Sequence, residues 1–147
     1  MPFEDLDKAL MFYSNVKFSD ADIISTITPH ADILRYLRGT QIVFLEKGNP
    51  DAGVTHILLR HIRDFQRKGI EVDEIVPLLE HTISNIRPLN VTIQARGLAL
   101  EYAFDDRRYP GLIHDTLRIA IGFNGFVVSA MPVGLSTVMG ALRRFVN

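Results

Sequence analysis

One stretch of the chain places a histidine and three arginines on what their spacing predicts to be one side of a helix. The helix is expected from about Thr55 to Lys68, with Gly69 as its C-terminal stop. At 100° per residue these polar residues fall within about 60° of one another, opposite the apolar side. They are His56, Arg60, Arg63 and Arg67. Because arginine presents a rigid fork of donors to phosphate oxygens, this side is a candidate phosphate site, and a solvated helix face is the alternative.

His61 falls at the edge of the same helix's apolar side, where it is either a second functional imidazole or a boundary residue. It forms a poor zinc pair with His56, because two ligands on one helix are expected at i,i+3 or i,i+4 spacing and these lie five residues apart. The chain has no cysteine, which excludes disulfides, thiolate metal sites and cysteine nucleophiles. It has no Walker loop, glycine-rich dinucleotide motif or GxSxG elbow. We therefore expect neither a metal ion nor a cofactor.

A second candidate surface lies on a hairpin predicted around Asn124-Gly125. A strand over residues 112–123 is expected to turn there and return over 126–131, because both turn residues accept the positive φ of a type I′ turn. The pairs expected from a two-residue turn are Phe123–Phe126, Ile121–Val128 and Ala120–Ser129. The face turned away from the core then carries His114, Thr116, Arg118, Ala120, Gly122 and Ser129. Small residues beside a histidine, an arginine and hydroxyls leave room for a ligand, and an ordinary solvated sheet face is the alternative.

The elements that must position these residues follow from hydrophobic spacing. Helical spacing is found over residues 3–13 and 20–38, and the second segment is divided at Pro29, which lacks the amide donor of a helix interior. A short strand is expected over residues 41–45, and the glycine, asparagine and proline within residues 47–50 predict the turn that ends it.

The spacing changes in the second half of the chain. A second helix is expected over residues 73–85. After Pro88 apolar and polar residues alternate, which predicts strands over residues 91–95 and 98–104 before the hairpin. A last short helix is expected after Ser136. Helices followed by an antiparallel meander indicate an α+β fold.

Length and composition indicate one folded domain. The 147 residues are 47% hydrophobic and 22% charged, which excludes a disordered chain. We divide the domain into an N-terminal extension (1–50), a core (53–133) and a C-terminal helix (134–147). The net charge of −1 argues against a generally basic nucleic-acid binder, so any nucleic-acid site must be local. Residues 1–32 carry six acidic residues and two lysines, whereas four basic residues face one aspartate over residues 60–68.

Two motifs in the core carry a resemblance. The first is the helix written GVTHILLRHIRDF over residues 53–65, and the second is the closing strand IGFNGFVVSAMPV over residues 121–133. With a second helix and a meander between them, residues 53–133 resemble the barnase–EndoU–colicin–RelE-like (BECR) ribonuclease domains. These occur as C-terminal toxin domains of contact-dependent and other polymorphic toxins, and in phage-associated proteins. In that family a helix histidine and a serine or threonine on the last strand commonly line the active site.

The resemblance implies metal-independent cleavage of RNA, tRNA among the candidates. The matching catalytic residues are His56, His61 and Ser129. His56 would take the proton of a ribose 2′-hydroxyl, and His61 or His114 would protonate the leaving 5′-oxygen. Histidine suits both roles because its ordinary pKa is about 6.5. The residues expected to bind substrate or stabilise its charge are Arg60, Arg63, Arg67, Arg118 and His114.

The resemblance also implies RNA and a cognate immunity or antitoxin protein as partners. No apolar run approaches the roughly 18 residues that span a bilayer, and the acidic N-terminus has no signal-peptide pattern. We therefore expect no membrane contact and a cytoplasmic location, reached from within the cell or by delivery into a target cell as part of a larger toxin.

The alternative is a protein without catalysis, either an immunity protein or a phage-associated interaction module of similar fold. An acidic N-terminal segment would suit an inhibitor of a basic toxin. One geometric feature separates the two hypotheses, because only an enzyme needs His56 or His61 within reach of the polar strand face. If the apolar side of the helix packs flat on the sheet, His56 points away from Ser129, and the sequence leaves this point open.

Overall fold

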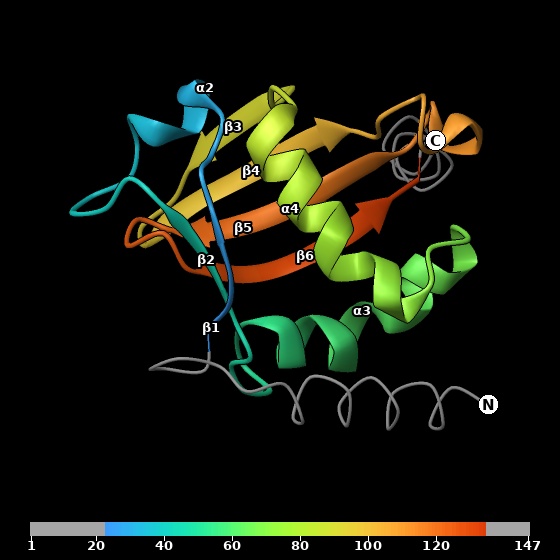
Figure 1. Ribbon diagram of the computed structural model, residues 1–147, viewed down its shortest axis with the longest axis horizontal. Coiled ribbons are helices and arrows are strands. Elements are labelled where there is room, and N and C mark those ends of the chain that lie inside the picture. The colour runs from blue at the N-terminus through green and yellow to red at the C-terminus, as the bar shows by residue number, and fades with distance from the viewer. Residues whose placement is uncertain (1–22, 135–147) are drawn as a thin grey trace, which may run out of the picture.

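The computed structural model describes residues 23–134, which have an α+β architecture (Figure 1). Within this range a four-stranded antiparallel meander has the order β3-β4-β5-β6, and β1 and β2 form a two-stranded sheet. The elements are β1 (Ile23–Ile27), α2 (Ala31–Leu34), β2 (Val43–Glu46), α3 (Val54–Arg67), the 3₁₀ turn η2 (Val72–Glu74), α4 (Ile75–Asn85), β3 (Asn90–Ile93), β4 (Gly97–Ala103), the 3₁₀ turn η3 (Pro110–Leu112), β5 (Thr116–Gly122) and β6 (Val127–Val133). The expected α+β class, with two helices followed by a meander, is confirmed. The helices predicted over residues 3–13 and after Ser136 lie outside the described residues.

The helix predicted over residues 20–38 is wrong for most of its described length. Ile23–Ile27 is a strand, and the only helix in the described part of that segment is the short α2 after Pro29. The sequence Ile-Ile-Ser-Thr-Ile is rich in β-branched residues, which fit an extended chain better than a helix. It pairs antiparallel with β2, so that Ile27 lies opposite Val43. Isoleucine spacing alone did not separate the two possibilities, and the pairing partner decided between them.

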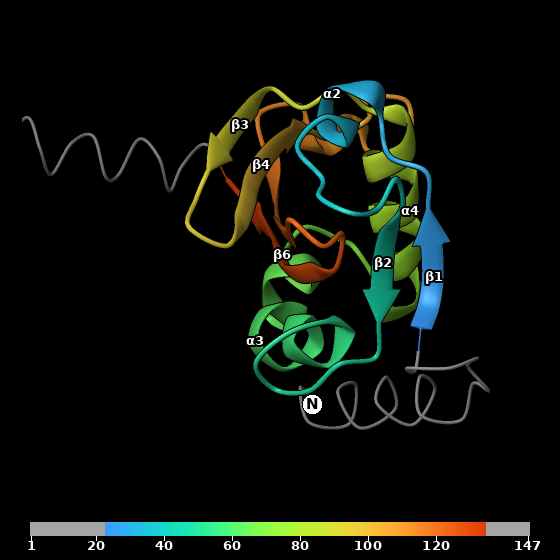
Figure 2. The same ribbon diagram turned by 90° about the vertical axis from the view of Figure 1, so that its left-hand side faces the viewer.

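Helix α4 lies across one face of the four-stranded sheet, and that face forms the core (Figures 1 and 2). The buried side chains of the sheet include Leu98, Leu100, Tyr102, Leu117, Ile119, Ile121 and Ala130, and α4 adds Ile75, Leu79 and Ile83. Alternation along the strands turns the intervening residues to the other side. This outward face carries Ala99, Glu101, Arg118, Ala120 and Ser129. None of the helices within residues 23–134 is long and apolar enough to cross a membrane.

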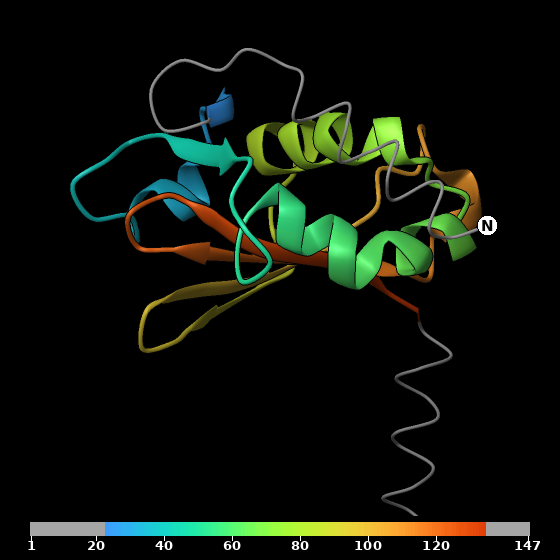
Figure 3. The same ribbon diagram turned by 90° about the horizontal axis from the view of Figure 1, so that it is seen from below.

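Helix α3 runs along the edge strand β6 and does not lie flat on the sheet (Figures 1 and 3). Its apolar side is buried through Ile57, Leu58, Ile62 and Phe65. The N-H of Gly53, immediately before the helix, donates to the carbonyl of Val128 on β6 at 3.0 Å. Gly53 has φ 88°, and a Cβ there would come within 3.0 Å of the carbonyl oxygen of Glu46. A glycine is therefore needed where the chain enters α3 beside the sheet edge.

The hairpin between β5 and β6 differs from the predicted two-residue turn. Gly122 N-H donates to Phe126 C=O at 2.9 Å, and Gly125 N-H donates to Gly122 C=O at 2.9 Å, so the loop has three residues. A bulge follows, and Ile121 pairs with Val127 in place of the predicted Val128. The predicted pair Ala120–Ser129 is confirmed. The bulge buries Val127 and leaves the side chain of Val128 39% exposed.

The strand predicted over residues 112–123 is also too long. Pro110–Leu112 forms a 3₁₀ turn, and β5 begins at Thr116. His114 therefore precedes the strand and does not lie on its outward face.

Candidate active site

His56 and Ser129 meet where α3 passes β6. The Nε2 atom of His56 lies 3.1 Å from Oγ of Ser129, and its Nδ1 lies 2.8 Å from the carbonyl oxygen of Pro50. A carbonyl only accepts hydrogen bonds, so Nδ1 carries the hydrogen. In the neutral ring Nε2 then has the free lone pair, and the Ser129 hydroxyl donates to it. This is the tautomer that a general base requires, with its basic nitrogen directed at the outward face of the sheet.

The loop before α3 holds the Pro50 carbonyl in place. The side-chain oxygen of Asn49 accepts the N-H groups of Asp51 at 2.8 Å and Ala52 at 3.2 Å. Asn49 N-H donates in turn to Ala52 C=O at 2.9 Å. Gly48 has φ 69°, and a Cβ on it would lie 2.1 Å from the carbonyl oxygen of Ala52. The turn is therefore closed on both sides of Pro50, and the imidazole of His56 is oriented by main-chain atoms.

His61 lies beside His56 and is held by a carboxylate. Its Nδ1 lies 3.0 Å from Oδ2 of Asp64, so Nδ1 donates and Nε2 is left for proton exchange. The rings of the two histidines are 5.9 Å apart between centroids and meet edge to face. Asp64 is absent from the residues selected by sequence. Its position three residues after His61 on one helix was the signal that identifies it.

The arginines of α3 lie along the exposed side of the helix. Arg60 and Arg63 are exposed, and no residue in the range 23–134 forms an ion pair with either of them. Arg67 lies 3.8 Å from Asp64 and is 74% exposed. At a rise of about 1.5 Å per residue, Arg60 and Arg63 follow His56 by about 6 and 10 Å along the axis. Two guanidiniums are thus available to an anion next to the histidines.

The structure brings one of the two remaining candidates to this surface. Arg118 lies on the outward face, two positions before Ala120, the partner of Ser129, and its guanidinium is 3.2 Å from the carboxylate of Glu101. His114 is exposed and precedes β5, whose first residue, Thr116, lies four positions before Ala120, or about 13 Å at roughly 3.3 Å per residue. The geometry therefore favours His61 over His114 as the second imidazole.

Two hollows border β6 on either side of Ser129. One, of about 680 Å³, is lined by Glu46, Ala52, Arg96, Gly122, Phe123, Asn124, Phe126 and Val128. The other, of about 300 Å³, is lined by Asp64, Arg67, Lys68, Met131, Pro132, Val133 and Gly134. Sequence reasoning missed the first hollow, because its wall residues come from segments far apart in the chain. An extended ligand that crosses Ser129 would enter both.

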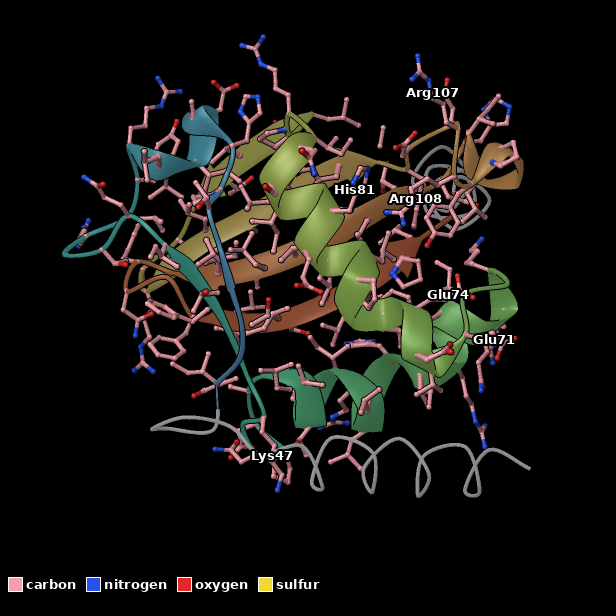
Figure 4. The ribbon with its side chains drawn as sticks, viewed as in Figure 1. Lys47, Glu71, Glu74, His81, Arg107 and Arg108 are labelled. Carbon is pink, nitrogen blue, oxygen red and sulfur yellow. The ribbon has the colours of Figure 1, made fainter. Side chains whose placement is uncertain are left out.

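A second histidine–carboxylate pair lies away from this site. His81 on α4 and the loop with Arg107 and Arg108 are shown in Figure 4. Nε2 of His81 is 2.9 Å from Oδ2 of Asp105, and Asn85 lies 3.3 Å from Nδ1. The hydrogen bond from His81 and that from the N-H of Arg107 lower the pKa of Asp105. Both ring nitrogens of His81 are occupied, so the pair links α4 to the loop and has no nitrogen free for proton transfer.

No group of three or more histidine and carboxylate side chains within residues 23–134 is placed to hold a metal ion. Among known proteins, no family model matches the chain, and no curated protein is similar to it. The assignment of this candidate site therefore rests only on the geometry of its residues.

Proposed function

We propose that the protein is a metal-independent endoribonuclease with His56 as its general base. The observation that carries the proposal is the contact of His56 Nε2 with Ser129 Oγ, 3.1 Å across α3 and β6, with Nδ1 held by a carbonyl. A protein that acts only by surface binding has no need of a histidine in this tautomer on a polar sheet face. The order α3, α4 and a four-stranded meander supports a BECR-like core over residues 53–133.

In the proposed reaction, Nε2 of His56 accepts the proton of a ribose 2′-hydroxyl, and the 2′-oxygen attacks the adjacent phosphorus. The bond from phosphorus to the 5′-oxygen breaks, and the leaving oxygen takes the Nε2 proton of His61, which enters the step as an imidazolium and keeps its Nδ1-H bonded to Asp64. The products are a 2′,3′-cyclic phosphate and a 5′-hydroxyl end. Each such proton transfer contributes about 10²–10⁴-fold to the rate. The 2′-hydroxyl restricts the substrate to RNA.

Ser129 and the arginines have the electrostatic role. When substrate displaces the contact of Ser129 with His56, the hydroxyl is free to donate to a phosphoryl oxygen. Arg60 and Arg63 add positive charge where negative charge develops in the transition state. As a toxin domain, the enzyme would act on the RNA of a target cell and be neutralised by a cognate immunity protein.

The test is incubation of the purified chain with total RNA, with and without EDTA, followed by analysis of the new ends. We expect cleavage that EDTA does not affect, cyclic phosphate and 5′-hydroxyl ends, and loss of cleavage in His56→Ala. His114→Ala is the matched control, since it removes an imidazole that lies far from Ser129. RNA that stays intact at high protein concentration would contradict the proposal and favour the non-catalytic alternative.

A further inference from the structure

The wall of the 680 Å³ groove includes Val128, the chain neighbour of Ser129 on β6. Val128 follows Ser129 toward the hairpin, and Gly122 lies two positions from Ala120, the partner of Ser129. The volume is within the range of about 300–1,000 Å³ that is typical of small-ligand sites. A nucleotide whose phosphate contacts Ser129 and His56 would therefore place a neighbouring base in this groove.

The two aromatic side chains in the wall of the groove are held in place by contacts with neighbouring residues. The ring of Phe126 stacks on Phe44 with centroids 4.9 Å apart. Phe44 N-H donates to Gly125 C=O at 2.8 Å, which joins β2 to the hairpin loop. On the other side of the loop, the guanidinium of Arg38 lies 4.0 Å from the ring centroid of Phe123. Aromatic side chains in fixed positions are the surfaces on which single-stranded bases stack.

The polar groups of the groove are unpaired within the described part of the chain. Neither the carboxylate of Glu46 nor the guanidinium of Arg96 has a hydrogen-bond or ion-pair partner among residues 23–134. The side-chain oxygen of Asn124 accepts the N-H of Phe126 at 3.2 Å, so its amide group remains available as a donor. The groove therefore offers one acceptor-only group, Glu46, beside two sets of donors.

We propose that this groove binds the base next to the scissile phosphate and that Glu46 selects cytosine over uracil. This inference rests on the proposed ribonuclease function. A carboxylate only accepts hydrogen bonds. Cytosine presents its exocyclic amine to such a group, whereas uracil presents a carbonyl oxygen at the same ring position, and two acceptors repel. The donors Arg96 and Asn124 suit the carbonyl oxygen that both pyrimidines share, so they add affinity without selection.

The experiment measures binding and cleavage in parallel on the full chain. Cytidine and uridine 3′- and 5′-monophosphates are titrated by NMR, and the dinucleotides CpA, UpA, ApC and ApU are tested as substrates. We expect one cytidine series to bind about tenfold more tightly than its uridine counterpart, as one base contact of about 1–3 kcal/mol allows. In Glu46→Gln the ratio should fall close to one, since an amide both donates and accepts. Asp73→Asn, an exposed carboxylate on η2, is the control that keeps the ratio.

The two proposals fail in different ways. Equal binding of cytidine and uridine nucleotides, or an unchanged ratio in Glu46→Gln, overturns the base site even if RNA is cleaved. Selective binding that Glu46→Gln abolishes, without any cleavage of RNA, supports the base site and overturns the ribonuclease function.

Discussion

The N-H of Gly53 donates to the carbonyl of Val128 at 3.0 Å, one residue from Ser129 on the edge strand β6. This bond fastens the N-terminus of α3 to the margin of the sheet. In this position the exposed side of α3 borders the outward face of β6, and the apolar side of α3 packs into the core. His56 therefore contacts Ser129 although it lies opposite the apolar side of α3.

Removal of the Ser129 hydroxyl tests its electrostatic role. Ser129→Ala should lower kcat/KM on RNA by about 10²-fold, the usual effect of one lost donor to developing charge. Ser129→Thr keeps a hydroxyl and suits a strand, so it should retain most of the activity. Initial rates on a short fluorogenic RNA give both values, and full activity of the alanine variant would exclude the hydroxyl from the reaction.

Asp64 is predicted to be a positioning residue that acts through His61. In Asp64→Asn the carboxylate that accepts from Nδ1 is lost, so we expect about a tenfold lower kcat and a mixture of His61 tautomers. Long-range ¹H–¹⁵N NMR spectra report the tautomers directly, which a merely structural effect would not change. The control is Arg67→Ala, since Arg67 contacts the other oxygen of the same carboxylate from the solvent side. This variant should leave the tautomer signals of His61 unchanged. A pure Nδ1-H tautomer in Asp64→Asn would refute this role.

The contact between His81 and Asp105 predicts how stability depends on pH. Because the folded pKa of Asp105 is lowered, first by the His81 hydrogen bond, the folded state favours the ionised carboxylate. This contribution is fully present above the ordinary aspartate pKa of about 3.9 and is lost as pH falls through the lower folded value. Urea unfolding between pH 7 and pH 2 should show a shallower acid decline for Asp105→Asn. Asp106→Asn, next to it, should follow the unmodified chain.

The buried hydroxyl of Tyr102 is expected to lower the stability of the core. Its side chain is fully buried on β4, burial raises its pKa, and among residues 23–134 its oxygen has no hydrogen-bond partner. Because a buried polar group without a partner costs free energy, Tyr102→Phe should raise the free energy of unfolding by about 1 kcal/mol. Chemical unfolding measures the change. Tyr36→Phe is the control, since that hydroxyl accepts from exposed Arg35 at 3.0 Å and its loss should bring no gain.

Local pattern was enough to predict α3, because the 14-residue helix combines a long apolar stripe with a glycine stop. The predicted pair Ala120–Ser129 is present although the turn differs, because the bulge restores the register that a two-residue turn would have given. The strand β1 was misread because isoleucines spaced for a helix also suit a strand, and only pairing with β2 separates the two. The bulge before Ile121 was not predictable, since it follows from the three-residue loop.

Some residues of the candidate site were predictable from the sequence, but the way they come together was not. His56, His61 and Ser129 were selected from the sequence, but their meeting depends on α3 lying at the sheet edge. The groove is a different case. Glu46 ends β2 and Arg96 lies in the connection between β3 and β4, so no local spacing relates them and only the folded chain identifies them.

The hydrogen bond to the carbonyl of Pro50 determines which sequence changes the orientation of His56 can tolerate. In many enzymes the tautomer of a catalytic histidine depends on a carboxylate side chain, which one substitution removes. Here it depends on a main-chain oxygen, which every amino acid at position 50 would supply. Point substitutions can disturb it only by altering the course of the loop from Gly48 to Gly53. The orientation of His56 is therefore encoded in the path of the backbone, and insertions or deletions in this loop are the changes to which it is most vulnerable.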